Sequence, residues 1–214
     1  MNRNLIAIIR GVDPEDILPI TKGLLESGIS WLEVSLSDEA KGLECIRKVS
    51  DAFADEVQLG VGTVISERQV DAALEAGATY IITPGWDREI AKYVRSKDIL
   101  LFPGVFSPGE IMQAASLGIE TVKVFPAIDL GFGFIKNVRG PFPNMNFMAV
   151  GGVTKENIHE FKNAGYSSFA IGSDLVPRGA SRKDVEKIKE NAKAFIQLLE
   201  KEAWSWDQQT KLSK

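Results

Sequence analysis

Short apolar runs alternate with amphipathic segments from one end of the chain to the other. Short runs bounded by turn residues predict buried strands, whereas the longer segments between them carry apolar residues at helical spacing. The predicted strands are Leu5–Ile9, Trp31–Leu36, Val57–Thr63, Thr79–Thr83, Ile99–Phe102, Thr121–Phe125, Asn146–Val150 and Ser168–Ile171. The pattern therefore predicts a strand and a helix repeated eight times.

The predicted helices have recognisable first residues. Asp13 precedes Pro14, which is the order of an N-cap and a first helical residue. Ser66 and Ser107 stand three residues before a glutamine and a glutamate, which is the spacing of a capping box. The last helix is predicted over Ser181–Glu202, where apolar residues recur at helical spacing.

Strands that alternate with helices predict right-handed βαβ units and hence a parallel sheet. The eight units form either a closed barrel or a large open sheet. They run evenly and no Gly-x-Gly-x-x-Gly sequence follows the first strand, so the pattern favours the barrel over a dinucleotide-binding sheet. We predict a single-domain α/β protein, a (β/α)8 TIM barrel over residues 1–202, followed by a C-terminal tail over residues 203–214.

Composition narrows the class of protein. Of the 214 residues, 44% are hydrophobic and 25% are charged, which is enough apolar material for a substantial core. The net charge of −4 gives no basic groove for nucleic acid, and no apolar run approaches the roughly 18 residues of a membrane helix. The single cysteine, Cys45, excludes an internal disulfide and falls in a helical pattern as a core thiol. We predict a soluble cytoplasmic protein without a nucleic-acid or membrane partner.

Two charged residues inside apolar strands point to the chemistry. Lys123 lies between Val122 and Val124, and because strand side chains alternate, valines that face the helices direct Lys123 into the barrel. Glu33 faces inward by the same rule, from a strand on the opposite side of the barrel. A buried unpaired charge is costly, so the two side chains form either a structural ion pair or a functional pair.

A functional pair would suit imine chemistry. Desolvation lowers the pKa of a lysine such as Lys123, so part of it is a free amine near neutral pH. A free amine attacks a ketone to form an imine, and the protonated imine withdraws electrons from a nearby carbon–carbon bond. Glu33 is the inward carboxylate available to move protons during these steps.

The loops after the last two predicted strands contain a candidate phosphate site. Gly151 and Gly152 follow the seventh strand, and Gly172 and Ser173 follow the eighth. Backbone amides in glycine-rich turns that lead to a helix bind phosphate, and these two loops form the usual phosphate site of a TIM barrel. Arg10, at the end of the first strand, either holds a substrate carboxylate or forms a salt bridge at the rim.

The remaining polar residues give weaker signals. His159, the only histidine, falls in the middle of a predicted helix and is expected at the solvated surface, as is Lys136. One histidine and one cysteine make no zinc cluster, whereas a magnesium site built of carboxylates alone stays open.

Several motifs carry a resemblance to a known enzyme family. They are Leu32–Leu36, Gly60–Val64, Ile82–Gly85, Pro103–Val105 followed by Ser107–Glu110, Val122–Ala127, Gly140–Pro143 and Gly151–Val153. Over roughly residues 5–200 the chain resembles the 2-keto-3-deoxy-6-phosphogluconate and 4-hydroxy-2-oxoglutarate aldolase family.

The resemblance implies a class I aldolase, a lyase of carbohydrate metabolism that uses neither metal nor other cofactor. It would cleave 2-keto-3-deoxy-6-phosphogluconate or 2-keto-3-deoxy-6-phosphogalactonate to pyruvate and glyceraldehyde 3-phosphate, with 4-hydroxy-2-oxoglutarate as a further candidate substrate. The residues implied are Lys123 for the pyruvate imine, Glu33 as acid and base, Arg10, Thr63 and Pro84 for the carboxylate, and Phe125 beside the lysine. The resemblance also implies a homotrimer.

Two departures from the family pattern bear on the substrate. Many gluconate-type members have an arginine after the second strand, where this chain has Ser37 and Asp38, which leaves Arg10 as the expected anchor. Val150 stands where a threonine is usual and, unlike a hydroxyl, makes no hydrogen bond to the substrate at C4, which favours the galactonate epimer. The alternatives are a phosphosugar isomerase or epimerase and a non-catalytic metabolite-binding barrel, and neither needs a buried lysine such as Lys123.

Overall fold

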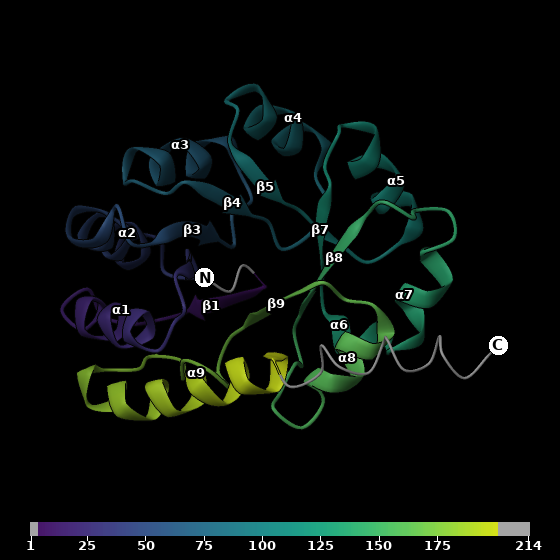
Figure 1. Ribbon diagram of the computed structural model, residues 1–214. Coiled ribbons are helices and arrows are strands. Elements are labelled where there is room, and N and C mark those ends of the chain that lie inside the picture. Colours follow the sequence, from purple (N-terminus) through teal and green to yellow (C-terminus); the bar gives the residue numbers. More distant parts are fainter. Residues whose placement is uncertain (1–3, 201–214) are drawn as a thin grey trace.

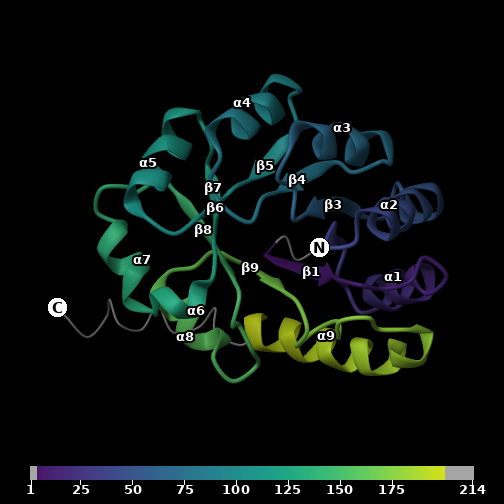
Figure 2. The same cartoon turned by 180° about the vertical axis from the view of Figure 1, so that it is seen from behind.

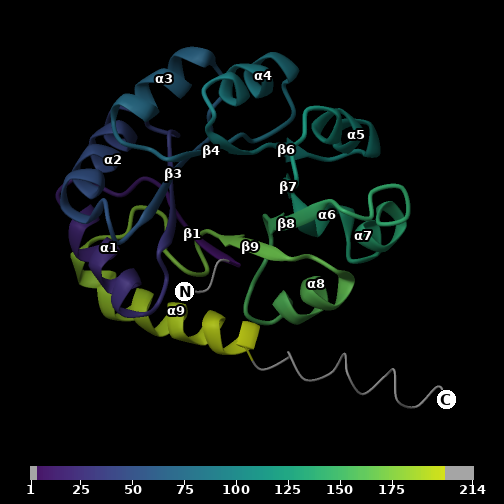
Figure 3. The same cartoon turned by 45° about the horizontal axis from the view of Figure 1, so that its top comes forward.

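The computed structural model describes residues 4–200 as a ring of strands enclosed by helices (Figure 1). The strands are β1 (Leu5–Ile9), β2 (Trp31–Ser35), β3 (Gln58–Gly62), β4 (Tyr80–Ile82), β5 (Leu100–Phe102), β6 (Gly104–Val105), β7 (Thr121–Val124), β8 (Asn146–Val150) and β9 (Ser168–Ile171). The helices are α1 (Ile17–Glu26), α2 (Glu39–Phe53), α3 (Glu67–Glu75), α4 (Arg88–Ser96), α5 (Pro108–Ser116), α6 (Ala127–Leu130), α7 (Gly133–Val138), α8 (Ile158–Ala164) and α9 (Val185–Glu200), with a 3-10 turn η1 (Arg182–Asp184). The reverse view in Figure 2 and the tilted view in Figure 3 keep the helices on the outside of the ring.

The strand segments form one parallel sheet in the order β5-β4-β3-β2-β1-β9-β8-β7-β6. Its two ends, β5 and β6, are separated in the chain only by Pro103, which has no N–H to donate. Across this break Gly104 N donates to Thr83 Oγ1 at 3.1 Å, and Lys123 N donates to Pro103 O at 2.9 Å, so the sheet closes. Thus β5 and β6 are one barrel strand, and the predicted single-domain (β/α)8 barrel is confirmed. The predicted strand Ile99–Phe102 lacks only the extension beyond Pro103.

The helix starts match the sequence in part. Ser66 and Ser107 each accept a hydrogen bond from the backbone N–H three residues later, so these two caps are confirmed. The start at Asp13 is wrong, because a hydrogen-bonded turn intervenes before α1 begins at Ile17. Ser181 caps the short turn η1 rather than α9.

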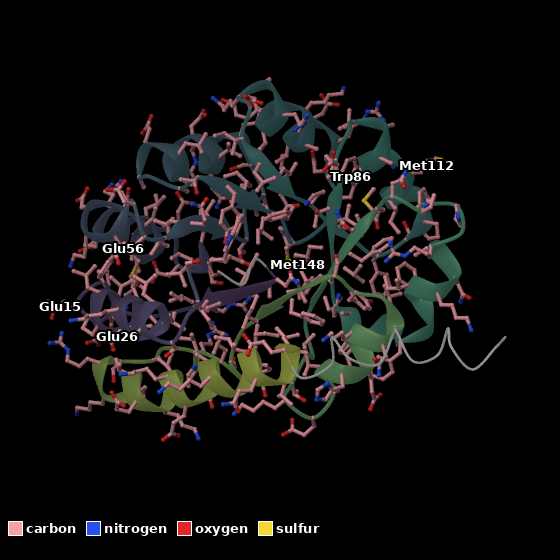
Figure 4. The ribbon with its side chains drawn as sticks, viewed as in Figure 1. Glu15, Glu26, Glu56, Trp86, Met112 and Met148 are labelled. Atoms are coloured by element: carbon pink, nitrogen blue, oxygen red, sulfur yellow. The ribbon has the colours of Figure 1, made fainter. Side chains whose placement is uncertain are left out.

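Two hydrophobic clusters lie on the two faces of the sheet. The larger one joins the outward strand side chains to the helices. The smaller one fills the barrel and consists of Ile6, Ile8, Tyr80, Ile82, Phe102, Met148, Val150 and Ala170, with Trp31 and Phe125 packed against them. Met148 lies near the centre of the ring in Figure 4. The rings of Trp31, Tyr80 and Phe102 contact one another at centroid distances of 5.1 to 6.3 Å, so the interior is packed core rather than a pore.

Three further predictions concern burial and chain ends. Cys45 is 2% exposed, as predicted for a core thiol, and burial raises its pKa to about 11. Within residues 4–200, no helix combines the length and the apolar character that crossing a membrane requires. The predicted boundary at residue 202 and the tail over residues 203–214 lie outside the described residues and stay predictions.

Candidate active site

Lys123 and Glu33 are the buried charged residues of the described part of the chain, with exposed fractions of 6% and 2%. Val122 and Val124 belong to the outer cluster, so Lys123 points into the barrel as the alternation predicts. Their strands, β7 and β2, are separated by three barrel strands on either side. The two charges therefore approach each other from opposite walls of the barrel.

The surroundings of Lys123 favour its neutral amine. Burial lowers the pKa of its ammonium group, and the charge of Arg10 lowers it further, while Glu33 raises it. The Nζ atom lies 4.6 Å from the centroid of the Phe125 ring, which packs beside it as the resemblance implies. A lysine with a lowered pKa supplies the nucleophile that imine formation requires.

The surroundings of Glu33 favour its neutral carboxylic acid. Burial raises the pKa of the carboxyl group, and the charges of Lys123 and Arg10 oppose that rise. Among residues 4–200, Glu33 has no hydrogen-bond partner, and its Oε2 atom is fully buried. No ion pair within 4.0 Å joins it to Lys123 in this part of the chain. The two groups thus shift each other's pKa without the direct contact that a structural ion pair would make.

A cavity of about 250 Å³ opens at the C-terminal ends of the strands on one side of the barrel. Its walls are Ile8, Arg10, Phe125, Val150, Gly151, Gly152, Val153, Ala170, Gly172, Ser173, Asp174 and Val176. The cavity thus brings together the predicted binding residues from β1, β7, β8 and β9. Phe125 belongs to both parts of the site, because it lines this cavity and also contacts Lys123.

The two glycine loops differ in conformation. Gly151 and Gly152 have φ values of 88° and 76°, the left-handed region that favours glycine, and Asn157 Nδ2 donates to Gly152 O. Gly172 begins a turn in which its carbonyl accepts from the N–H groups of Leu175 and Val176. From the sequence, both loops are expected to lead into a helix. Neither does so directly, because α8 begins at Ile158 and α9 at Val185. Any phosphate here would have to be held by amides of the turns themselves.

Thr63 and Pro84 lie at the ends of neighbouring strands, outside the cavity lining. Thr63 has a φ of 65°, an unusual backbone conformation for a β-branched residue that costs roughly 1–3 kcal/mol and often marks a functional position. Its Oγ1 lies 3.0 Å from Ser35 Oγ, which lies 2.7 Å from Ser37 Oγ. Hydroxyl groups therefore gather after the second strand, where many gluconate-type members of the family that the chain resembles have an arginine.

Arg10 lies at the rim and is exposed. Within residues 4–200 its side chain has no ion-pair partner, which removes the alternative of a rim salt bridge. Its carbonyl accepts a hydrogen bond from Gly179 N at 2.9 Å, which ties the loop after β1 to the loop after β9. Arg10 lines the cavity, and its charge also influences the pKa of both Lys123 and Glu33, so it is close to both parts of the site.

The weaker candidates are also placed. Lys136 is exposed on α7, as predicted. His159 is half-buried on α8 and its Nδ1 atom is inaccessible to solvent, so it is less solvated than predicted. Residues 4–200 contain no group of three or more histidine, cysteine, aspartate or glutamate side chains arranged to hold a metal ion.

Several site residues escaped the sequence analysis. Asp174 and Val176 line the cavity from the loop after β9. Tyr80 lies close enough for Glu33 to influence its pKa, and Tyr80 OH donates to Leu32 O at 2.8 Å. Asp174 follows directly on Ser173, so chain position alone could have found it, whereas Tyr80 gives no signal apart from its aromatic character.

Comparisons with known proteins point to one enzyme family. The family model for KDPG and KHG aldolase matches residues 1–191. A probable 2-dehydro-3-deoxy-6-phosphogalactonate aldolase from Rhizobium meliloti is 33% identical over 190 residues, 87% of this chain and 88% of the relative. A 2-dehydro-3-deoxy-phosphogluconate aldolase from Pseudomonas aeruginosa is 37% identical over 147 residues, 68% of this chain and 66% of the relative.

Several solved structures are also similar to this chain in fold and sequence. A native KDPGal structure has a TM-score of 0.84 and 30% identity, covering 93% of this chain and 95% of its own. KDPG aldolase from Legionella pneumophila, with pyruvate captured as a covalent carbinolamine, has a TM-score of 0.78 and 30% identity over 91% of each chain. A cage designed by fusing symmetric oligomeric domains has a TM-score of 0.88 and 29% identity, over 99% of this chain and 77% of its own. With the family model matched over nearly the whole barrel, this chain belongs to the KDPG and KHG aldolase family of aldehyde-lyases.

Proposed function

We propose that this protein is a class I aldolase that holds pyruvate as an imine on Lys123 and uses Glu33 to move protons. One observation carries the proposal: a buried lysine with a lowered pKa faces a buried carboxyl group with a raised pKa, and no ion pair joins them. Burial without pairing is costly for both groups and has no evident benefit for folding. The carbinolamine captured in the Legionella relative is the kind of intermediate that this chemistry passes through.

The reaction runs through an enamine. The neutral Lys123 amine attacks the C2 ketone, and the neutral Glu33 carboxylic acid gives up its proton as water leaves, which produces a protonated imine and the Glu33 carboxylate. Glu33 takes the proton of the C4 hydroxyl, the C3–C4 bond breaks to release the aldehyde, and its electron pair forms the C2=C3 bond of the enamine while the imine π pair moves to nitrogen. Glu33 then returns the proton to C3, which restores the protonated imine, and water hydrolyses this imine to pyruvate and the free amine while the released proton goes back to Glu33.

The proposed substrates are 2-keto-3-deoxy-6-phosphogluconate and 2-keto-3-deoxy-6-phosphogalactonate, cleaved to pyruvate and glyceraldehyde 3-phosphate. The phosphate would bind the turn amides around Gly151, Gly152, Gly172 and Ser173 in the cavity. The carboxylate would bind near Lys123, held by Arg10 together with the Thr63 hydroxyl and the backbone at Pro84. The family description also supports 4-hydroxy-2-oxoglutarate, which lacks the phosphate and would release glyoxylate.

For the C4 epimer we propose that the galactonate compound is accepted at least as well as the gluconate compound. Val150 is 3% exposed and forms part of the cavity wall, directly before Gly151. Its methyl groups offer no hydrogen bond to either C4 epimer. The Rhizobium relative, matched over most of this chain, is described as acting on the galactonate compound.

The proposed assembly is a homotrimer in the cytoplasm. Large apolar side chains are exposed at Ile65 (65%), Phe106 (46%) and Met112 (61%), which is typical of a surface covered by another subunit. The similar domain in the designed cage is described as symmetric and oligomeric. A buried cysteine and the absence of any possible internal disulfide suit a reducing compartment. Sedimentation equilibrium should give three times the 23.4 kDa chain mass.

The decisive experiment is borohydride reduction in the presence of pyruvate. Mass spectrometry of a digest should find one reduced pyruvyl adduct on the peptide that contains Lys123. An adduct on Lys136 or Lys155 instead, or none at all, would contradict the proposal. A parallel assay of the two phosphorylated epimers then decides the preferred substrate.

A further inference from the structure

Gly62 is a buried glycine whose backbone conformation does not require glycine. It lies at the end of β3, and its φ is outside the left-handed region occupied by nine other glycines of residues 4–200. A Cβ atom at Gly62 would lie 1.7 Å from Glu33 Oε1 and 2.5 Å from Glu33 Cδ. The space where a side chain would stand is therefore filled by the Glu33 carboxyl group.

The register of the strands shows which way Glu33 leans. The Cα partner of Glu33 on β3 is Gly60, yet its carboxyl group lies against Gly62, two residues nearer the C-terminal mouth of the barrel. The position beside Gly60 is taken by the Tyr80 ring, which a Cβ there would meet at 2.1 Å. The two glycines thus make room for different groups, an aromatic ring deeper in the barrel and a carboxyl group above it.

We infer that Gly62 is a positioning residue, which directs the Glu33 carboxyl group toward the mouth of the barrel and the bound keto acid. The inference rests on the proposed function, because it assigns Gly62 a role through the proton transfers of Glu33. Among the described residues no hydrogen bond holds the carboxyl group, so the shape of this space is what fixes it. An added methyl group would displace Glu33 while leaving Lys123, on the opposite wall, in place.

The test is a cycle of size-compensating variants: Gly62→Ala, Glu33→Asp and the two combined. Two readouts separate the steps. Deuterium exchange into the pyruvate methyl group, followed by NMR in D₂O, measures proton transfer, and borohydride trapping of pyruvate measures imine formation. Gly60→Ala, alone and combined with Glu33→Asp, is the matched control because its methyl group meets Tyr80 instead.

We expect Gly62→Ala to slow exchange by roughly 100-fold, because small displacements of a catalytic group have effects of this size, and to leave the final yield of trapped adduct largely intact. The shorter aspartate leaves room for the methyl group, so Gly62→Ala should slow exchange much less in the Glu33→Asp background. Gly60→Ala should show no such compensation. Equal losses from Gly62→Ala in both backgrounds, or undiminished exchange in the single variant, would overturn the inference.

A double-mutant cycle measured by thermal unfolding covers the case in which Gly62→Ala is too unstable for the activity assays. Gly62→Ala should lower Tm strongly beside Glu33 and far less beside Glu33→Ala, where the space is empty. An equal loss of Tm in both backgrounds would overturn the inference. This readout needs no chemistry, so it still judges the Gly62–Glu33 contact if the wild-type protein forms no pyruvate adduct, the result that would defeat the proposed function alone.

Discussion

The buried end of the site and its rim are built on opposite principles. At the buried end, Lys123 and Glu33 are almost inaccessible, and within residues 4–200 no hydrogen bond stabilises the charge of either. At the rim, Arg10 and Ser173 are exposed, and glycine turns line a cavity of about 250 Å³. Under the proposed function, reactivity would be obtained by removing water from charged groups, and recognition by leaving donors within reach of a solvated anion.

The largest loss of activity is expected from Lys123→Met, at the buried end of the site. Removing the nucleophile should lower kcat by about 10⁴-fold or more and abolish borohydride trapping. The fold should survive, because an apolar side chain of similar length replaces a buried charge. Steady-state kinetics and Tm check both statements, with the exposed Lys136→Met as the control. Turnover that survives in a folded Lys123→Met protein would refute the imine mechanism.

The second variant at the buried end is Glu33→Gln. It should lower kcat by roughly 10²–10⁴-fold, since an amide cannot carry protons between the reacting atoms. Tm should not fall, because a buried carboxyl group without partners is replaced by a neutral group of the same shape. Undiminished turnover in the folded variant would leave Glu33 with an electrostatic role only.

The pH dependence of imine formation tests the coupling between the two buried groups. Burial lowers the pKa of Lys123, so the rate of trapping should rise with pH and level off below the ordinary lysine value of 10.5. The charge of Glu33 raises the pKa of Lys123, so Glu33→Gln should move this rise to lower pH. Stopped-flow or quench trapping across pH measures it, and a rise that moves to higher pH would contradict the sign.

At the rim, Gly172→Val should affect recognition alone. A Cβ at Gly172 meets no atom within 4 Å, so the substitution fits the fold while filling the cavity. Loss of hydrogen bonds to a charged phosphate predicts a decrease in kcat/KM of roughly 10- to 100-fold for phosphorylated substrates. Pyruvate trapping should be unchanged, and Gly140→Val, also in open space, is the matched control. If trapping fell equally, the loop would be supporting Lys123 rather than binding phosphate.

The smallest effect is expected from Val150→Thr, which lies between the two ends. One new hydrogen bond allows the ratio of kcat/KM to shift toward the gluconate epimer by about 2- to 12-fold. Competition between the two phosphorylated epimers measures this ratio in the variant and the wild type. An unchanged ratio in a folded variant would mean that Val150 serves the interior packing only.

Much of the buried end follows from local sequence pattern. Alternation along β7 places Lys123 inward, because its valine neighbours pack under the helices, and the same rule places Glu33. The barrel itself follows from the strand and helix repeat. Pro103 shows the limit of this reasoning, since a proline ends an apolar run without showing that the strand resumes beyond it.

Contacts across strands were not predictable in the same way. The contact between Gly62 and the Glu33 carboxyl group depends on the register between β2 and β3 and on a side-chain torsion of Glu33. Neither can be predicted from the local sequence pattern. His159 was misplaced because one helical turn decides whether a polar residue meets solvent or a neighbouring element. That Arg10 forms no salt bridge within residues 4–200 could not be predicted either, because the prediction needs the position of every acidic side chain within reach.

The aromatic group of Trp31, Tyr80 and Phe102 has a consequence for the order of events in turnover. These rings pack the barrel beneath the carboxyl group of Glu33, so molecules enter and leave by the C-terminal mouth. Under the proposed function, a pyruvyl group bonded to Lys123 would lie on the inner side of any phosphorylated fragment in the cavity. We therefore expect an ordered sequence, in which the triose phosphate departs before pyruvate and, in the synthetic direction, pyruvate must bind before the aldehyde.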